Sequence, residues 1–374
     1  MRPLTVVQIL PELSAGGVER GTLEVARALV AAGHRSIVIS HGGRMVAQLE
    51  REGSRHIALP VHRKSLASLW QVRPLRHLLA ELKPDILHAR SRVPAWIAWL
   101  AWRKLPAATR PHFITTVHGL YSVSPYSAIM VKGERVIAVS ETVRDYILKN
   151  YPQCAPEKIE LIFRGIDAAE FPYGYQPSAA WQAQWQQDFP QLAGKIVLTL
   201  PGRITRLKGH ESLIELVAAL KQRGLPVHGL IAGGAEAKKQ DYLAEVKSRI
   251  EARGLQADIS FTGHRNDLKD VLAVSNIVYT LSNKAETFGR TTLEALSLGV
   301  PVLGWDQGGV SEILQRRFPQ GAVAFGNAED LLARTLELIR NPGKPPQQDS
   351  FRLETMLGET LAVYEKVAAK CDFN

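Results

Sequence analysis

Residues 197–209 read V-L-T-L-P-G-R-I-T-R-L-K-G, a buried strand that runs into a glycine turn and then directly into a helical pattern. The turn carries two cations, Arg203 and, five residues later, Lys208. In α/β folds a loop of this kind lies at the carboxyl edge of a parallel sheet, where ligands bind. The guanidinium and the ammonium together suit a diphosphate, and Gly202 and Gly209 allow the backbone itself to approach it. The alternative is an ordinary solvated basic loop.

A second segment, residues 286–294, reads E-T-F-G-R-T-T-L-E and predicts the start of a short helix. Gly289 and Thr291 open this helix, so its free N–H groups and positive dipole end can hold an anion. Glu286 lies in the loop before the helix, and Glu294 lies about one turn inside it. Carboxylates accept hydrogen bonds from vicinal hydroxyls. A nucleotide sugar, with its diphosphate between two sets of hydroxyls, would meet suitable groups here. The alternative is an ordinary helix with an acidic loop residue.

With both segments in view, the chain resembles the family-four group of retaining glycosyltransferases, which have the GT-B fold. Members carry G-R-x-x-x-x-K-G followed about eighty residues later by E-x-F-G-x-x-x-x-E, and residues 202–209 and 286–294 match in order and spacing. Five further stretches agree: P-E-L-S-A-G-G-V-E-R, T-T-V-H-G, V-I-A-V-S-E, F-R-G-I-D and G-G-V-S-E. The resemblance therefore extends over nearly all of residues 5–325. Arg164 is a departure, because many members have Asn before G-I-D. This puts the interdomain hinge or the acceptor side in doubt and leaves the donor motifs untouched.

The resemblance implies an α/β protein of the GT-B class, with two Rossmann-like domains whose parallel sheets face a central cleft. It implies that Arg203 and Lys208 stabilise the leaving diphosphate. Glu286 would hold the transferred sugar, and Glu294 would hold the ribose. His118 would line the reaction centre; its alternative role is to satisfy buried backbone groups. The other donor-binding residues are expected to be Gly16, Gly17, Gly202, Gly289, Arg290 and Thr291. For Gly16 and Gly17 the alternative is an ordinary tight turn.

No metal or other cofactor is expected besides the nucleotide-sugar substrate. The chain has no D-x-D pair to hold a divalent ion beside a diphosphate, and the two cations of the first segment can supply the compensating charge. Its two cysteines, Cys154 and Cys371, lack metal-ligand spacing, which favours a reduced setting. The sequence shows no signal-like start and no apolar run of about 18 residues. We therefore expect a cytoplasmic protein, at most peripheral on the inner membrane.

The length of 374 residues exceeds one compact core and predicts two α/β domains. Strand-like runs alternate with helical periods, as in parallel sheets joined by crossover helices. Strands are predicted near 5–10, 36–40, 55–59, 85–88, 113–117, 135–139, 158–162, 195–200, 227–232, 258–262, 276–281 and 301–304. Gly33 is expected to end a helix over 18–32, and Ser140 is expected to cap a helix over 141–149. The predicted domains are an acceptor-side domain at 1–166, a linker at 167–194, a nucleotide-sugar-binding domain at 195–345 and a helix at 350–374 that crosses back to the first domain.

Positive charge is concentrated in the first half of the chain. Residues 1–165 hold 23 Lys/Arg and 12 Asp/Glu, a balance of +11, whereas residues 166–374 have a balance of −1. Since a GT-B enzyme receives its acceptor in that half, the excess implies an anionic acceptor or an anionic membrane surface. The alternative is a generic solubility charge. The candidate anchors are Arg90 and Arg92, which follow a buried strand and are expected on an accessible carboxyl-edge loop facing the cleft; the alternative is that they pair with surface carboxylates. A second basic patch is formed by Arg63, Lys64, Arg73 and Arg76, with an ordinary solvated surface as the alternative.

Trp96, Trp99 and Trp102 recur every three residues, which favours packing between helix and sheet over an interfacial membrane face. The predicted function is transfer of a hexose-type sugar from a nucleoside diphosphate sugar, with a UDP-sugar favoured, to a membrane-linked glycan such as lipopolysaccharide core. The expected partners are that donor, an anionic glycolipid or oligosaccharide acceptor and the inner face of the cytoplasmic membrane, with no nucleic acid. One alternative is a nucleotide-sugar epimerase of the same fold, against which the paired motifs argue. The other is a nucleic-acid-binding or nucleic-acid-modifying protein, for which the chain lacks an aromatic-basic motif.

Overall fold

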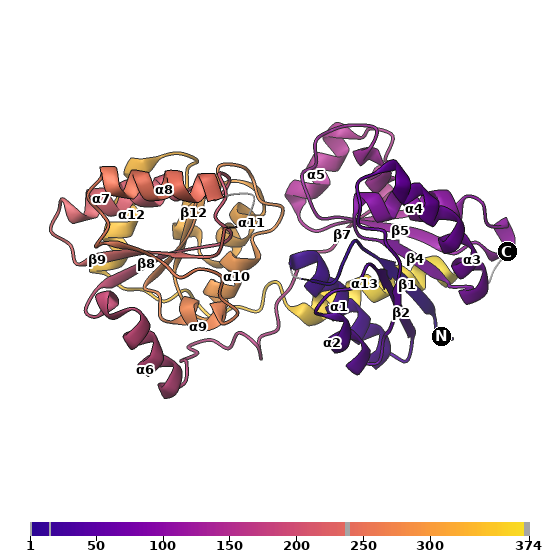
Figure 1. The fold of residues 1–374 in the computed structure, drawn as a ribbon, viewed down its shortest axis with the longest axis horizontal. Coiled ribbons are helices and arrows are strands. Elements are labelled where there is room, and N and C mark those ends of the chain that lie inside the picture. Colours follow the sequence, from indigo (N-terminus) through magenta and orange to yellow (C-terminus); the bar gives the residue numbers. More distant parts are fainter. Residues whose placement is uncertain (1, 15, 236–239, 370–374) are drawn as a thin grey trace. The chain divides into compact units, whose positions relative to one another are not determined.

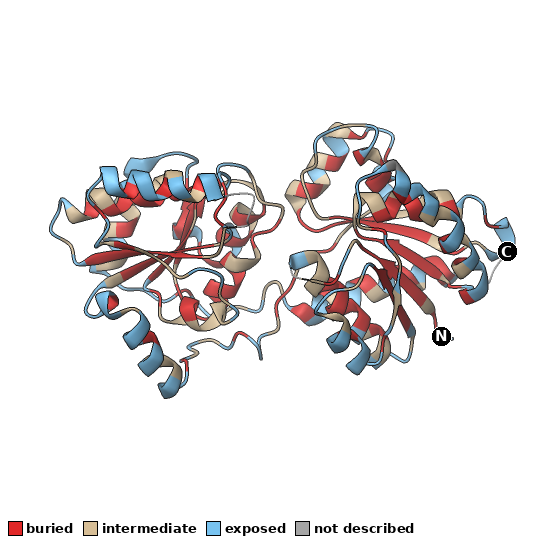
Figure 2. Ribbon diagram, in the orientation of Figure 1, coloured by how far each residue is buried: buried red, intermediate tan, exposed pale blue. Residues whose placement is uncertain are grey.

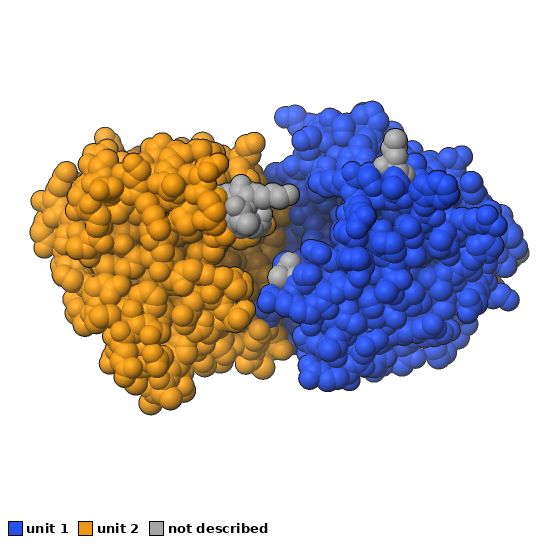
Figure 3. Space-filling model, viewed as in Figure 1, with its two compact units in different colours: residues 1–165, 353–374 blue, residues 166–352 orange. Residues whose placement is uncertain are grey.

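The computed structural model describes residues 2–14, 16–235 and 240–369. The chain forms two compact units, which Figure 3 shows in different colours. Unit 1 comprises Met1–Gly165 with Leu353–Asn374, and unit 2 comprises Ile166–Arg352. Each unit contains one parallel sheet with helices on both faces (Figure 1), so the predicted α/β architecture of two Rossmann-like domains is confirmed.

Unit 1 is built on a seven-stranded parallel sheet in the order β3-β2-β1-β4-β5-β6-β7. Its strands are β1 (Thr5–Ile9), β2 (Arg35–Ser40), β3 (Arg55–Ala58), β4 (Ile86–Ala89), β5 (His112–Val117), β6 (Arg135–Ala138) and β7 (Ile159–Leu161). Its helices are α1 (Gly17–Ala31), α2 (Val46–Arg51), α3 (Val72–Leu82), α4 (Arg92–Trp102), α5 (Glu141–Asn150) and α13 (Leu353–Ala368). A 3₁₀ helix, η1 (Leu66–Gln71), leads directly into α3.

The strands of unit 1 are apolar along most of their length because helices cover both faces of the sheet (Figure 2). Helices α3, α4 and α5 cover one face, where Leu75, Ile97 and Ile147 are buried. Helices α1 and α13 cover the other face, where Leu29 and Tyr364 are buried. The last helix thus belongs to unit 1, although it follows unit 2 in the sequence.

Unit 2 is built on a six-stranded parallel sheet in the order β10-β9-β8-β11-β12-β13. Its strands are β8 (Ile196–Pro201), β9 (Val227–Ala232), β10 (Ile259–Phe261), β11 (Ile277–Thr280), β12 (Val302–Trp305) and β13 (Ala322–Val323). Its helices are α6 (Ala179–Asp188), α7 (His210–Lys221), α8 (Gln240–Ala252), α9 (Leu268–Ala273), α10 (Arg290–Ser297), α11 (Gly308–Arg317) and α12 (Ala328–Arg340). Helices α7, α8 and α12 cover one face, where Leu213, Val246 and Leu331 join the core around Tyr279.

In each sheet, the two strands that follow the earliest strand in the chain lie on one side of it, and the later strands lie on its other side. In unit 1, β1 lies between β2 and β4, and in unit 2, β8 lies between β9 and β11. At such a switch point the loops that leave the two diverging strands open a crevice at the carboxyl edge of the sheet. The loops after β1 and β4 therefore define the candidate ligand edge of unit 1. The loops after β8 and β11 define that of unit 2.

The predicted strands agree with the observed ones to within one residue at each end, and the two-residue strand β13 is the one that the sequence did not suggest. Ser140 caps α5 as predicted, because its Oγ accepts a hydrogen bond from the N–H of Val143 over 3.1 Å. Gly33, with φ of 79°, follows the end of α1, as expected for a glycine beyond a helix C-terminus.

Residues 167–194 differ from the predicted linker, because they contain α6 and belong to unit 2. Trp185 is buried against Val197 and other residues of the sheet. Trp181 donates from Nε1 to Asp267 over 2.7 Å. These two tryptophans, one helical turn apart, attach the segment to unit 2 rather than leaving it as a free connection.

Candidate active site

The loops that follow β8 and β11 meet at the switch point of unit 2. Lys208, in the first loop, places its Nζ 2.7 Å from Oε1 of Glu286 in the second loop. The hydroxyl of Ser282 donates to the same oxygen over 2.5 Å. The Lys208 and Glu286 side chains remain 30% and 25% exposed. The structure therefore joins the two segments that the sequence singled out, and both charged groups remain accessible to a ligand.

Two opposing effects act on the carboxyl of Glu286. Burial alone raises its pKa, but the charge of Lys208 and the hydrogen bonds from Lys208 and Ser282 outweigh that effect. The net result is a pKa below the ordinary value of 4.5, so Glu286 is ionised at neutral pH. An ionised carboxylate acts only as a hydrogen-bond acceptor, and sugar hydroxyls can donate to it.

The start of α10 carries the second predicted carboxylate. Gly289 caps this helix with φ of 94°, and a Cβ there would lie 2.7 Å from Cγ2 of Val310, so the position requires glycine. In the first turn, Arg290 donates from Nε to Oε1 of Glu294 over 3.0 Å. Glu294 is buried, and Thr291 is half-buried. The helix start thus combines backbone donors with an oriented carboxylate.

A glycine pair at the start of α11 holds the loop that carries Glu286. The N–H of Gly309 donates to the carbonyl of Glu286 over 2.8 Å, and a Cβ on Gly309 would lie 2.3 Å from Cα of Phe288. Gln307 donates from Nε2 to the carbonyl of Ser282 over 2.6 Å. The sequence offered G-G-V-S-E only as part of the resemblance and gave these residues no role. The paired glycines after a buried strand were the signal for this close approach.

The β8 loop also depends on glycine. Gly202 and Gly209 have φ of 134° and 73°. A Cβ on Gly209 would lie 1.8 Å from the carbonyl oxygen of Leu281, which follows β11. A Cβ on Gly233, after β9, would lie 1.9 Å from the carbonyl oxygen of Gly202. The backbones after three neighbouring strands therefore come together around an exposed Arg203.

In unit 1, the loop after β1 enters α1 through Gly16, which caps the helix with φ of 133°. Arg164, the departure from the family pattern, donates from Nη2 to the carbonyl of Gly17 over 2.7 Å. A Cβ on Gly21 would lie 2.1 Å from the same nitrogen. The arginine is therefore accommodated within unit 1, against the first turns of α1.

His118 follows β5, and the charges of two arginines, Arg164 and Arg90, act on its imidazole. Burial, and then the charges of Arg164 and Arg90, hold the pKa of its imidazole well below the ordinary 6.5. His118 is therefore neutral at pH 7 and has one ring nitrogen able to donate and one able to accept. His88, on β4, is a core histidine that is hydrogen-bonded to the hydroxyl of Tyr364 over 2.6 Å.

Arg90 differs from the expectation that it lies on an accessible carboxyl-edge loop. Its side chain is 2% exposed, and Nη1 donates to Oε1 of Gln8 over 2.5 Å. The reason is that its backbone continues the pairing with β1, donating to the carbonyl of Ile9 over 3.0 Å. Arg92 is half-buried and lies with its guanidinium 4.4 Å from the ring centroid of Tyr121. Of the two predicted acceptor anchors, only Arg92 is accessible.

Comparison with known proteins also divides the chain in two. Residues 15–170 match the model of Glycosyltransferase Family 4, and residues 182–352 match that of Glycosyl transferases group 1. The crystal structure of a glycosyltransferase from Rickettsia africae ESF-5 superimposes with a TM-score of 0.86 at 29% identity, covering 98% of this chain and 99% of that one. The chain belongs to the GT-B glycosyltransferases.

Other matches within the GT-B class are more distant. Anabaena Alr3699/HepE in complex with UDP-glucose has a TM-score of 0.76 at 18% identity over 99% of this chain and 100% of that one, which shows the fold alone. The mannosylfructose-phosphate synthase of Agrobacterium fabrum is 29% identical over 47% of this chain and 38% of its own length. The lipopolysaccharide core biosynthesis mannosyltransferase LpsB of Rhizobium meliloti is 27% identical over 41% of this chain and 42% of its own length. None of these matches favours an epimerase or a nucleic-acid-binding protein.

The three regularly spaced tryptophans of this GT-B chain pack against the core of unit 1. Trp96, Trp99 and Trp102 are half-buried on α4. Trp96 donates from Nε1 to the carbonyl of Tyr126 over 2.8 Å, and Trp102 donates likewise to Pro111 over 2.6 Å. The indole N–H groups of these two tryptophans are thus bonded within the protein, in keeping with the packing role that their spacing favours.

Across residues 2–14, 16–235 and 240–369, the GT-B chain has no helix with the length and apolar character needed to span a bilayer. Within the same ranges, no three His, Cys, Asp or Glu side chains are grouped so that they could hold a metal ion.

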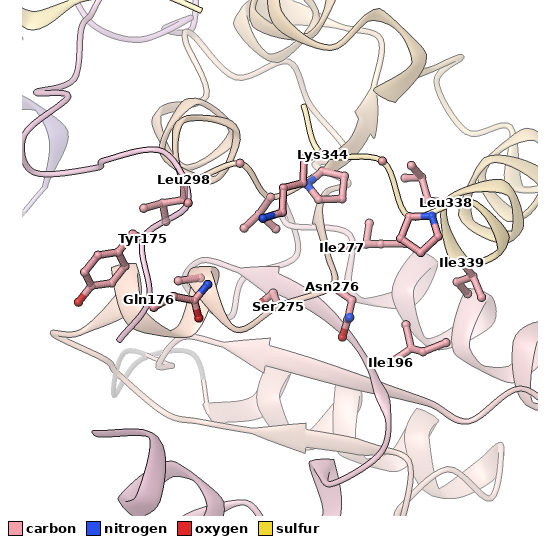
Figure 4. Close-up of a pocket in the computed structure, with 17 residues that line it drawn as sticks. Tyr175, Gln176, Ile196, Ser275, Asn276, Ile277, Leu298, Leu338, Ile339 and Lys344 are labelled. Atoms are coloured by element: carbon pink, nitrogen blue, oxygen red, sulfur yellow. The ribbon is translucent and has the colours of Figure 1, made fainter. Parts of the chain in front are cut away.

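A separate pocket of about 280 Å³ lies at the amino edge of the unit 2 sheet (Figure 4). Ile196 and Ile277 line it at the start of β8 and β11, and Lys344 lines it after α12. The side chain of Asn276 already accepts the backbone N–H of Val197 over 2.8 Å. Because it lies at the edge opposite the loops that follow β8 and β11, this pocket is not the candidate donor site.

Proposed function

We propose that the chain is a retaining, metal-independent glycosyltransferase that moves a hexose-type sugar from a UDP-sugar to a membrane-linked glycan of the lipopolysaccharide core type. The observation that carries the proposal is the ion pair between Lys208 and Glu286 at the switch point of unit 2. It places a cation suited to phosphate beside a carboxylate suited to sugar hydroxyls. A nucleotide sugar presents a phosphate and sugar hydroxyls together at its reacting end. The UDP-glucose bound to the Anabaena neighbour supports this donor class.

In the proposed reaction the bond between the anomeric carbon and the β-phosphate oxygen breaks. A bond from an acceptor hydroxyl oxygen forms on the same face of the sugar, and the departing phosphate oxygen takes the acceptor proton. Negative charge grows on the diphosphate as it leaves, and Arg203 and Lys208 stabilise it together with the N–H groups at the start of α10. Lys208 is already oriented by Glu286, so little reorganisation is needed.

The two carboxylates take different parts of the donor. Glu286 is ionised and accessible, and it accepts hydrogen bonds from the transferred sugar. Glu294 is buried and oriented by Arg290, and it accepts hydrogen bonds from the ribose. His118, neutral at pH 7, serves the reaction centre as a hydrogen-bonding group and not as a fixed cation.

The charge balance of the units supports an anionic acceptor. Unit 1 holds 25 Lys/Arg and 16 Asp/Glu, whereas unit 2 holds 21 and 20. Net charge raises the local concentration of oppositely charged partners. A phosphorylated glycolipid is such a partner, and the relative named for lipopolysaccharide core biosynthesis supports this class.

The donor is tested by thermal unfolding with a panel of nucleotide sugars. Binding at a hundredfold excess over Kd stabilises a protein by about 2.7 kcal/mol, so UDP-sugars should raise the midpoint clearly. Lys208→Ala should lose this shift, and Lys284→Ala, which changes an exposed lysine of the β11 loop, should keep it. The absence of a shift with every nucleotide sugar would contradict the proposal.

The reaction is tested with the donor that gives the shift. NMR of the product should show the donor's anomeric configuration, and transfer should continue in the presence of a chelator. An inverted product would exclude the retaining mechanism. Loss of transfer with chelator, restored by magnesium or manganese, would exclude metal independence.

A further inference from the structure

Two adjacent apolar side chains of unit 1 face solvent. Trp70 is 81% exposed, more than any other large hydrophobic side chain in the described ranges, and Leu69 beside it is 45% exposed. Both lie on η1, where the chain enters α3. Single exposed apolar residues are common, but an exposed Trp-Leu pair at a helix entrance suggests a surface that something covers.

The pair borders a basic groove of about 550 Å³. The groove is lined by Leu69 and Trp70 from η1, Val72, Arg73 and Arg76 from α3, and Lys104 from the turn after α4. Lys104 is distant in sequence from the other lining residues. It reaches the groove because α3 packs against α4 (Figure 1). We call these six residues the Trp70 patch.

The charge around the Trp70 patch is of one sign. Residues 53–80 contain five Lys/Arg and no Asp/Glu. Arg63 and Lys64, just before η1, are exposed, as are Arg73 and Lys104. Within the described part of the chain, none of these four cations forms an ion pair with a carboxylate. An apolar pair is therefore surrounded by cations whose charge is not compensated nearby.

We propose that the Trp70 patch docks the chain on an anionic lipid bilayer. Indole rings favour the boundary between headgroups and acyl chains, and Lys and Arg beside them are attracted to anionic headgroups. A leaflet of anionic lipids attracts each Lys or Arg near its surface, so a cluster of cations of one sign beside an exposed indole matches a surface of lipid phosphates. The inference rests on the proposed function, because a membrane-linked acceptor requires the enzyme to work at the bilayer surface.

The structure thereby changes which tryptophans are candidates for membrane contact. Trp96 and Trp102 are half-buried and donate from Nε1 to backbone carbonyls, so they are committed to the core of unit 1. Trp70 is exposed and has adjacent basic residues. The candidate for membrane contact is therefore Trp70 and not the regularly spaced tryptophans of α4.

The test is co-sedimentation of the full chain with vesicles of phosphatidylglycerol mixed with phosphatidylcholine, and with vesicles of phosphatidylcholine alone. No nucleotide sugar and no acceptor are present. The wild-type chain should bind the anionic vesicles, weakly bind the neutral ones, and be released by salt. Each charge near such a surface is worth roughly a fivefold change in affinity, so Arg73→Glu with Arg76→Glu should weaken binding by about 25-fold or more.

Leu69→Ser with Trp70→Ser removes the exposed apolar pair of the patch and should weaken binding at least tenfold. Both sites are exposed, so the thermal midpoint should be unchanged. Matched controls lie in unit 2: Phe325→Ser changes a 56% exposed aromatic side chain, and Arg223→Glu with Arg340→Glu reverses two exposed arginines. These controls should bind the anionic vesicles as the wild type does. Quenching by brominated lipids should be weaker for Trp70→Phe than for the wild type.

Three outcomes would overturn the inference: no binding of the wild type to anionic vesicles, equal binding to both kinds of vesicle, or patch variants that bind like the controls. A concentration-dependent dimer in sedimentation velocity that Trp70→Ser abolishes, without vesicle binding, would make the patch a self-association surface instead. Vesicle binding is measured without donor or acceptor, and the nucleotide-sugar shift without vesicles. Failure of the docking inference and failure of the proposed function are therefore separate results.

Discussion

The carboxyl edges at the switch points of the two sheets differ in how their charged groups are arranged. In unit 2, cations are paired with carboxylates, as in Lys208 with Glu286 and Arg290 with Glu294. In unit 1, burial and then the charges of Arg164 and Arg90 lower the pKa of His118, which is neutral at pH 7. An edge of opposite charges can offer an ionised carboxylate and a cation to one ligand, which suits hydroxyls and phosphates together. Near His118, burial and two arginine charges keep the histidine uncharged, and the Glu24 carboxylate acts on one of those arginines, Arg90. The fold is shared, and the residues on the loops set the chemistry.

The largest expected effect breaks the cationic half of the unit 2 edge. Lys208→Ala and Arg203→Ala should each lower turnover by roughly a hundredfold or more, the scale of losing a preorganised group that stabilises developing charge. Steady-state transfer from a UDP-sugar measures this. Lys284→Ala, on the β11 loop, should retain near-normal turnover. Near-normal turnover in both Lys208→Ala and Arg203→Ala would refute the leaving-group role.

The close backbone approach in unit 2 is tested by two glycines of nearly equal φ. Gly209 and Gly224 have φ of 73° and 72°, but a Cβ meets the carbonyl oxygen of Leu281 at Gly209 and open space at Gly224. Gly224→Ala should cost about 1–2 kcal/mol for the left-handed backbone alone. Gly209→Ala should cost at least about 1–3 kcal/mol more because of the added crowding. Urea unfolding gives both values, and equal costs would mean that the loop yields without strain.

The pairing of Glu286 predicts a pH dependence of stability. Its pKa in the folded chain lies below the ordinary 4.5, so the ionised pair stabilises the fold above that value. This contribution is lost as the pH falls through the lowered folded pKa. The difference in unfolding free energy between the wild type and Glu286→Gln should therefore be larger at about pH 6 than at about pH 3. A difference that is constant over this range would show that Lys208 does not favour the ionised form.

The smallest expected effect concerns the cationic edge of unit 1. Reversing Arg90 would bury a carboxylate beside Gln8, so the acceptor test uses accessible Arg92 alone. Arg92→Glu should raise the apparent acceptor constant several-fold, on the order of fivefold, with donor binding unchanged. Salt should weaken acceptor use by the wild type, because exposed charges are screened within about 8–10 Å. Equal use of phosphorylated and dephosphorylated acceptors, without salt dependence, would mean that this excess charge only solvates the surface.

The sequence predicted the strands well because parallel strands covered on both faces are continuous apolar runs, as in β12 at Val302–Trp305. It also brought Lys208 and Glu286 to one edge, since both follow buried strands. It failed at α6, whose ten residues bury only Trp185 and therefore carry no clear helical period. It failed at Arg90 because burial depends on pairing with β1, about eighty residues earlier in the chain. Contacts between distant segments, such as Gly309 with Glu286, leave no local pattern to read.

Helix α13 has a consequence for the order in which the chain can acquire its structure during translation. A ribosome releases all of unit 2 before Leu353–Ala368, which supply the final cover over one face of the unit 1 sheet. Until then, strand residues such as Val6 and Ile114 lack the neighbours Met356 and Tyr364. The first-made half of the protein is thus completed last, and its uncovered apolar face is the natural site for chaperone binding on the nascent chain. A chain stopped at Arg352 would keep unit 2 whole and leave unit 1 prone to aggregate.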